Sequence, residues 1–455
     1  MDQRQAMSTM LISAFTRSKE LKSRILFLLG ALIVYRVGTH IPLPGVDAFA
    51  LEYYKESLSG GLFGLFNTFS GGAFARMSMF ALSVFPYISA SIVMMILKIA
   101  VPYIAELYKE GSKGRAKVEQ YTKYLAVVLS FVQGYGLALS VQGQQVNING
   151  DVAQLVADQS MMFPLHTALT IAASTMFLMW LGERITAKGL YNGLSVLIFA
   201  GIVAEMPASI IQAFEMNQVG TVSGFTLLGI VIWVFIMLGF VCFVESSERR
   251  LILKNPRALS QAKQGNIDFS NEAYLPFKVN TPGVMPVIFA SSVIIFITGG
   301  LSLIPESEFA VTLSTYLARG SMGYVALYAL TIVVFSFLFA SVMFDTKEQS
   351  EGLRKNGNFI PGIRPGKPTQ MYFDYLLTRL TFIGAIYLVL VCVLPELLGL
   401  QISLATQFSG TSILIMVGVV IGIFEDVKRY IKEQVQAELM SKHSFRKGPR
   451  RKVQR

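Results

Sequence analysis

The chain carries only two cysteines, three histidines and two tryptophans among its 455 residues. Cys242 and Cys392 fall inside apolar runs, so the sequence offers neither a disulfide framework nor the ligand spacing of a metal site. It contains no GxxxxGK[ST] phosphate loop, and no Ser-His-Asp set can be assembled from the spacing of its residues. We therefore expect no cofactor, no metal and no catalytic residue.

Charged residues are also scarce. They make up 15% of the chain, whereas 53% is hydrophobic and the mean hydropathy is +0.54. A soluble domain with this composition would have to expose a large apolar surface. The sequence therefore predicts a polytopic membrane protein. We interpret its net charge of +11 mainly as a sign of which loops lie on which side of the membrane.

About ten apolar runs are long enough to cross a bilayer as helices. They lie near 23–41, 77–101, 121–142, 161–181, 190–214, 222–244, 282–304, 322–344, 376–398 and 409–427. About five precede the midpoint, and halves with an odd number of spans insert in opposite orientations. We predict an all-α fold of two inverted five-helix halves, 23–215 and 216–430, between an N-terminal segment at 1–22 and a basic tail at 431–455.

Lysine and arginine concentrate in alternate loops and in the tail from Lys442 to Arg455, whereas the opposite loops hold little beyond Lys55, Arg76 and Arg319. This bias places both termini in the cytoplasm. The first run is followed by Ile41-Pro42-Leu43-Pro44-Gly45 and not by the small residues of a cleavage site. We therefore expect the first span to be retained.

Two of the predicted cytoplasmic loops are long, 245–280 and 345–375, and each has enough turn residues for a small protruding structure. The second contains the segment Pro361 to Gly366, in which two Pro-Gly pairs flank Arg364. Such a stiff turn presents the arginine at a fixed place and favours a docking tip. A solvated charged loop is the commoner explanation of this pattern.

One apolar segment is too short to span. Gly60 and Gly61 precede it, the run from Leu62 to Phe69 has helical spacing, and Ser70-Gly71-Gly72 ends it. A span needs ~20 residues, and irregular backbone at membrane depth survives only inside protein or a water-filled cavity. We expect a re-entrant half-helix within 61–74 that caps a pore, followed by a full-length apolar helix from about Met77 to Val101.

Ionisable residues in or near the spans are few: Arg36, Lys98, Glu205, Glu245 and Arg379. Snorkelling toward the interface explains most of them. Glu205 is the candidate for a substrate or proton site, although an interface carboxylate is the simpler interpretation. Val84 and Ile88 are four residues apart and share one helix face, where a ring of such side chains would exclude water and ions.

Nine short motifs follow one another along the chain. They are Arg36 to Gly45, Phe69 to Ala73, Pro86 to Ile92, Met179 to Glu183, Asn192-Gly193, Leu275 to Asn280, Pro282 to Pro286, Pro361 to Gly366 and Gly410 to Ser412. In this order they closely resemble the SecY family, the central subunits of the bacterial Sec protein-conducting channel. The resemblance extends from Arg24 to about Arg429.

The resemblance implies an hourglass channel for unfolded secretory chains, with a lateral gate through which membrane segments leave into lipid. Its plug would contain Leu62, Phe63, Leu65, Phe66, Asn67, Phe69, Ser70, Gly71 and Gly72. Its constriction ring would be Val84, Ile88, Ile198, Ile288 and Ile415. The gate, between spans two and three and spans seven and eight, would include Ser89, Met95, Thr122 and Asn280.

The resemblance also implies partners. A SecA-like ATPase or the translating ribosome would dock on Pro361, Gly362, Arg364, Lys254, Arg257 and Lys263. An arginine suits both partners because it forks onto carboxylate or RNA phosphate. SecE-like and SecG-like subunits and the bacterial cytoplasmic (inner) membrane are implied as well. Since the ATP chemistry belongs to the motor, this chain itself would not be an enzyme.

Three features depart from the family pattern. Met95 stands where many relatives carry glutamine, which leaves Asn280 and Thr122 as remnants of a polar gate latch. Glu205 replaces a small residue. The loop from Arg250 to Lys278 is slightly longer and less basic than usual, which predicts weaker docking of the ribosome than of the motor.

Two other classes of function fit parts of the pattern. A secondary transporter of small solutes also has inverted halves and a broken helix, but it needs polar residues converging at mid-depth, where this sequence places aliphatic ones. A membrane-embedded hydrolase needs an assembled nucleophile and base. The sequence therefore favours a passive protein-conducting channel driven by a partner.

Overall fold

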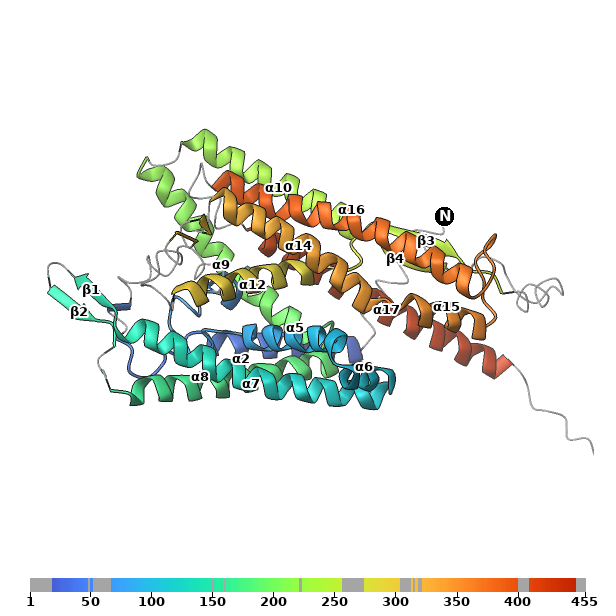
Figure 1. Ribbon diagram of the computed structural model, residues 1–455, viewed down its shortest axis with the longest axis horizontal. Coiled ribbons are helices and arrows are strands. Elements are labelled where there is room, and N and C mark those ends of the chain that lie inside the picture. The colour runs from blue at the N-terminus through green and yellow to red at the C-terminus, as the bar shows by residue number, and fades with distance from the viewer. Residues whose placement is uncertain are drawn as a thin grey trace, which may run out of the picture.

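The computed structural model describes residues 19–47, 50–51, 67–148, 151–156, 158, 160–220, 223–255, 274–302, 312–313, 316–317, 321–399 and 409–446. In these ranges one long helix lies at each of the ten predicted spans (Figure 1). The helices are α2 (Lys19–Gly38), α5 (Phe85–Ala100), α7 (Ser112–Gln142), α8 (Met162–Lys188), α9 (Gly193–Gln218), α10 (Gly224–Glu245), α12 (Met285–Ser302), α14 (Met322–Met343), α16 (Lys367–Gly399) and α17 (Gly410–Arg446). The predicted all-helical polytopic fold is confirmed.

The shorter elements lie at the ends of the bundle. They are the helices α6 (Pro102–Lys109) and α15 (Thr346–Lys355) and two antiparallel strand pairs, β1 (Gln145–Ile148) with β2 (Asp151–Gln154) and β3 (Glu248–Ile252) with β4 (Tyr274–Lys278). Among the described residues, seven helices are long and apolar enough to span alone, and α5 and α6, bent by 99°, make an eighth candidate. The bend falls at Val101-Pro102, because the extended Val101 ends one helix and the proline begins the next.

The two halves repeat one order of packing. In the first half α5 packs on α7, α7 on α8 and α8 on α9. In the second half α12 packs on α14, α14 on α16 and α16 on α17. Because each half contributes five helices, equivalent helices run in opposite directions, as expected for inverted repeats.

The second span differs from its prediction, because α5 begins at Phe85 and not near Met77. Residues 71–84 form successive turns, and Met77 and Ser83 adopt positive φ angles of 43° and 48°. Such angles interrupt a right-handed helix, whereas Pro86 suits the first turn of a new one. At 16 residues, α5 is about 24 Å long and covers only part of the bilayer.

The short apolar segment is described only from Asn67 onward. Residues 67–70 are helical, and Gly71 and Gly72 follow with φ angles of 67° and 78°, a conformation that glycine adopts without strain. The predicted plug residues Leu62, Phe63, Leu65 and Phe66 lie outside the described residues, as do Arg257 and Lys263.

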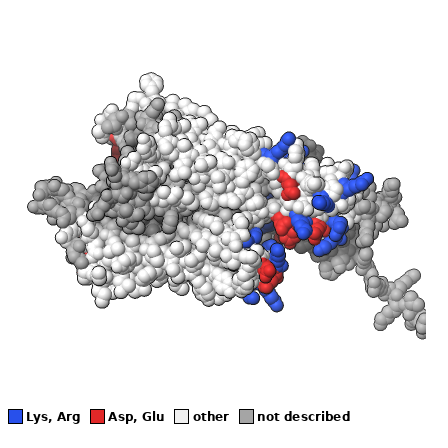
Figure 2. All heavy atoms as spheres, in the orientation of Figure 1, with Lys and Arg blue, Asp and Glu red and all other residues white. Residues whose placement is uncertain are grey.

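Charged side chains gather at one end of the molecule. Figure 2 shows lysine, arginine, aspartate and glutamate over the end where Figure 1 places α6, α15 and the β3–β4 pair, while the rest of the visible described surface is almost free of them. This segregation agrees with the predicted cytoplasmic loops.

The corner between α8 and α9 depends on close backbone contact. The Asn192 side chain accepts hydrogen bonds from the backbone N–H groups of Leu194 and Ser195 and so caps α9. The Gly193 N–H donates to Thr186 Oγ1 at 2.8 Å. A Cβ atom at position 193 would collide with the Gly182 carbonyl, so only glycine fits.

We expect Gly193→Ala to lower the free energy of unfolding by about 1–3 kcal/mol, because the new methyl group meets a backbone that cannot move aside. Thermal unfolding of the purified protein in detergent measures the change. Gly229→Ala in α10 is the matched control, since its Cβ meets nothing within 4 Å and alanine favours the helix. Equal melting temperatures for the two variants would contradict this account of the corner.

Candidate functional site

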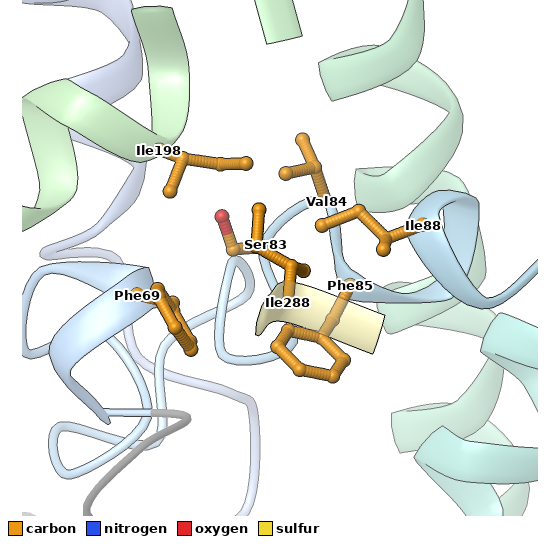
Figure 3. A pocket seen from close by; sticks show the side chains of 7 residues that line it. All are labelled: Phe69, Ser83, Val84, Phe85, Ile88, Ile198 and Ile288. Carbon is orange, nitrogen blue, oxygen red and sulfur yellow. The ribbon is translucent and has the colours of Figure 1, made fainter. Parts of the chain in front are cut away.

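Four of the five predicted ring residues line one small cavity (Figure 3). Its lining is Phe69, Ser83, Val84, Phe85, Ile88, Ile198 and Ile288. The cavity measures about 10 Å³, roughly the space that one water-sized probe needs. The side chains therefore close this level of the bundle.

The lining comes from both halves of the fold. Val84 and Ile88 lie at the start of α5, Ile198 lies on α9, and Ile288 lies on α12 of the second half. The fifth predicted ring residue, Ile415 of α17, does not line the cavity but belongs to the same buried hydrophobic cluster. A narrow constriction with aliphatic walls dewets, so it excludes water and ions.

The segment from Asn67 to Gly72 closes the cavity on one side. The Phe69 ring lies 5.9 Å from the Phe85 ring and forms part of the lining. A Cβ on Gly71 would lie 2.8 Å from Gly201 Cα of α9, so the two glycines let the backbones touch. The Tyr35 hydroxyl of α2 donates to the Ser70 carbonyl at 3.3 Å. The segment is therefore docked on α2 and α9 of the first half.

Two arginines hold the end of this segment. Arg36 Nη1 and Arg76 Nη2 donate to the same Gly71 carbonyl at 2.9 and 2.6 Å, and Arg76 Nε donates to the Thr39 carbonyl at 3.3 Å. Hydrogen bonds from charged donors are stronger than neutral ones. Arg36, which the sequence analysis attributes to snorkelling, is therefore an anchor of the segment.

Glu205 lies beside Arg76. A Cβ at Gly72 would lie 2.5 Å from Glu205 Oε2 and 2.7 Å from Arg76 Nη1, so the carboxylate and the guanidinium approach the same point. Neighbouring cations favour a carboxylate beside them. Arg76 gives Glu205 an oppositely charged neighbour, and no described contact adds support to the substrate or proton site considered from the sequence.

The predicted gate residues have separate surroundings. Met95 is buried in the cluster that α5 shares with α12 and α14, and Ser89 is half-buried on α5. Thr122 Oγ1 donates to the Val118 carbonyl of its own helix at 2.8 Å. Asn280 Nδ2 donates to Glu245 Oε1 at 2.7 Å. In the described residues the amide and the hydroxyl therefore have partners other than each other.

The described parts of the two long loops, 245–255 with 274–280 and 345–375, form one body. Lys254 and Phe359 exchange backbone hydrogen bonds of 2.9 and 3.0 Å, and Asn255 Nδ2 donates to Asn358 Oδ1 at 3.1 Å. A shared hydrophobic cluster lies beneath them and contains Leu251, Phe277, Ile360, Phe373, Leu376, Leu377 and Leu380. The predicted protrusions are thus a single structure on a common core.

Arg364 is exposed at the tip of this body. Gly362 and Gly366 flank it with φ angles of 84° and 103°, where glycine is favoured. Thr369 Oγ1 donates to the Arg364 carbonyl at 2.9 Å, and Ser350 Oγ donates to the Gly366 carbonyl at 2.7 Å. The backbone that carries the arginine is therefore fixed, while its guanidinium faces solvent.

Sequence reasoning missed several residues of the site. Ser83 and Phe85 line the cavity, yet neither belongs to a periodic pattern that would distinguish it. The sequence identifies Arg76 only as one of the few basic residues in the loops opposite the cytoplasmic ones. The one available signal was the three glycine and proline positions around 71–86, which mark irregular backbone in an apolar run.

Comparisons with known proteins agree with the geometry. The sequence model of the SecY family matches residues 78–424. Protein translocase subunit SecY of Rickettsia typhi is 40% identical over 427 residues, which cover 93% of this chain and 97% of that protein. The same subunit of Escherichia coli K12 is 40% identical over 417 residues, 90% and 91% of the two chains.

Solved structures share the fold. One described as a protein conducting channel superposes with a TM-score of 0.63 at 15% identity, over 91% of this chain and 93% of that chain. Sec61 in a canine ribosome-channel complex gives 0.60 at 14% identity over the same shares. The family model and the relatives together confirm the resemblance carried by the motifs, and the chain belongs to the SecY family of protein translocase subunits.

Proposed function

We propose that unfolded secretory chains cross the membrane through the constriction formed by Val84, Ile88, Ile198, Ile288 and Ile415. As a SecY protein, this chain is a multi-pass channel subunit of the protein translocase and not an enzyme. The observation that best supports the proposed path is a closed apolar cavity lined by both halves of the bundle. Separation of the halves would widen it without breaking either half.

An aliphatic ring suits a permeant of variable sequence. It seals around a chain by shape, and it offers no charge or hydrogen bond that would retain one side chain over another. Conduction requires such weak binding. In the same proposal, the segment that ends at Gly72 is a plug, held over the ring by Arg36 and Arg76 until a chain displaces it.

The lateral gate would open along the seam between α5 and the pair α12 and α14. The residues that α5 contributes to this seam are mainly apolar, and they include Ile92 and Met95. Because apolar side chains lose little when lipid or an apolar peptide replaces their neighbours, the seam can part toward the membrane. Signal sequences and membrane segments are the expected occupants.

The charged end would face the cytoplasm of a bacterial cell and receive the driving partner, with both termini on that side. A SecA-like ATPase or a ribosome would dock on the joint body of the two loops, around Arg364 and Lys254. One similar structure is described as a ribosome-channel complex. SecE-like and SecG-like subunits would complete the assembly. A small-solute transporter lacks support, since the cavity between the halves is lined mainly by apolar side chains.

Ile88→Asn is expected to make the resting channel leak ions, because a polar side chain in the ring lets water enter the constriction. The measurement is conductance of the reconstituted channel in planar bilayers without a substrate. Ile88→Val, which keeps the ring apolar, is the matched control and should stay closed. A double variant Arg36→Met/Arg76→Met should leak as well, since it frees the plug. Closed Ile88→Asn channels would contradict the proposed ring.

Arg364→Lys is expected to weaken docking of the ATPase or the ribosome about tenfold, because lysine keeps the charge and loses the forked geometry. Binding of each purified partner to the reconstituted channel measures it. Lys367→Ala, at an exposed neighbouring residue, should change affinity far less. Unchanged affinity in Arg364→Lys, together with a clear loss in Lys367→Ala, would show that only net charge matters at this tip and would contradict the forked contact.

A further inference from the structure

The two halves of the bundle meet along two unlike seams. On one seam, between α9 and α17, the Tyr191 N–H donates to Asp426 Oδ2 at 3.1 Å, and the Tyr191 ring fills the space that a side chain at Gly422 would need. The Arg24 guanidinium also lies 5.4 Å from the centre of the Tyr430 ring. This seam is therefore held by a hydrogen bond and by interlocking side chains.

The other seam, where α12 lies beside α5 (Figure 1), is mainly apolar. Among the described residues a polar contact lies at the cytoplasmic end, where Lys98 Nζ of α5 donates to the Val342 carbonyl of α14 at 3.2 Å. Val342 lies in the last turn of α14, and carbonyls in a last turn have no partner within their own helix. The negative end of the helix dipole adds to the attraction for an ammonium group.

Groups on both sides of the seam position the Lys98 amine. On its own side the amine lies 4.6 Å from the centre of the Tyr108 ring of α6, a cation–π contact. On the other side the Asp345 carboxylate, which caps α15 through the N–H groups of Lys347 and Glu348, attracts the amine. Snorkelling, expected for Lys98 from the sequence, does not describe these contacts.

We propose that Lys98 is a clasp that holds the lateral gate closed at its cytoplasmic end. The proposal rests on the proposed function, since it assumes that α5 parts from α12 and α14 when the channel opens. Opening would break the bond to Val342 and leave the amine with Tyr108. Met95, one turn away, lies in the hydrophobic cluster, so among the described residues the polar side-chain contact across the seam comes from Lys98.

The clasp is tested by the width of the seam, which does not depend on transport. The purified channel complex in lipid nanodiscs would carry nitroxide labels at Ile96→Cys of α5 and Val334→Cys of α14, positions that are 47% and 48% exposed. Serine would replace the exposed Cys242. Pulsed electron spin resonance then gives the distance distribution between the helices, at rest and with a synthetic signal peptide.

Lys98→Met keeps the length of the side chain and removes its donor. We expect the fraction of wide-seam channels at rest to rise about three- to tenfold, the range for losing a partly exposed hydrogen bond from a charged donor. Lys98→Arg should retain the narrow distribution, because its guanidinium can donate to the same carbonyl. Lys109→Met removes an equal charge from the exposed end of α6 and should also leave the seam narrow.

Each contrary result has a distinct meaning. If the signal peptide widens the seam but Lys98→Met matches the wild type at rest, the clasp is wrong and the gate stands. If Lys109→Met widens the seam as much as Lys98→Met, surface charge and not the clasp is responsible. If no variant widens even with the signal peptide, the gate assignment fails and the clasp fails with it.

Discussion

The structure depends on an apolar contact between the two halves of the bundle. Val84, Ile88 and Ile198 from the first half meet Ile288 from the second around a cavity of about 10 Å³. Within the membrane there is little hydrophobic force to hold helices together, so packing and a few polar links decide how firmly they join. In the proposed function the halves separate at this level, while the interlocked seam at Tyr191 and Gly422 stays together.

A break in the second span places the start of α5 at this contact. Because Met77 and Ser83 hold left-handed backbone angles, the chain turns repeatedly before Phe85, and α5 begins at the cavity itself. The same turns bring Gly71 against Gly201 and aim its carbonyl at Arg36 and Arg76. Irregular backbone at this depth persists because protein groups satisfy it. The closing segment and the ring are thus products of one interruption.

Much of this fold follows from the sequence, since ten long apolar runs and the distribution of lysine and arginine report directly on lipid and water. The residue at which α5 starts cannot be predicted in this way, because hydropathy carries no information on backbone angles such as the φ angle of Ser83. The contacts of Arg36 and Lys98 with backbone carbonyls do not follow either, since a cation near a span end is usually a snorkelling one. The ring residues came from family resemblance, because one buried isoleucine looks like any other in an apolar helix.

The most direct test of the account is site-specific photocrosslinking of a stalled secretory chain, with the probe at Ile88 in the ring. Val389 of α16, which packs in the separate hydrophobic cluster of the second half, is the control position. The account predicts strong adducts at Ile88 that depend on the motor or the ribosome, and none at Val389. Absence of adducts at Ile88, under conditions where another SecY channel gives them at its ring, would contradict the proposed path.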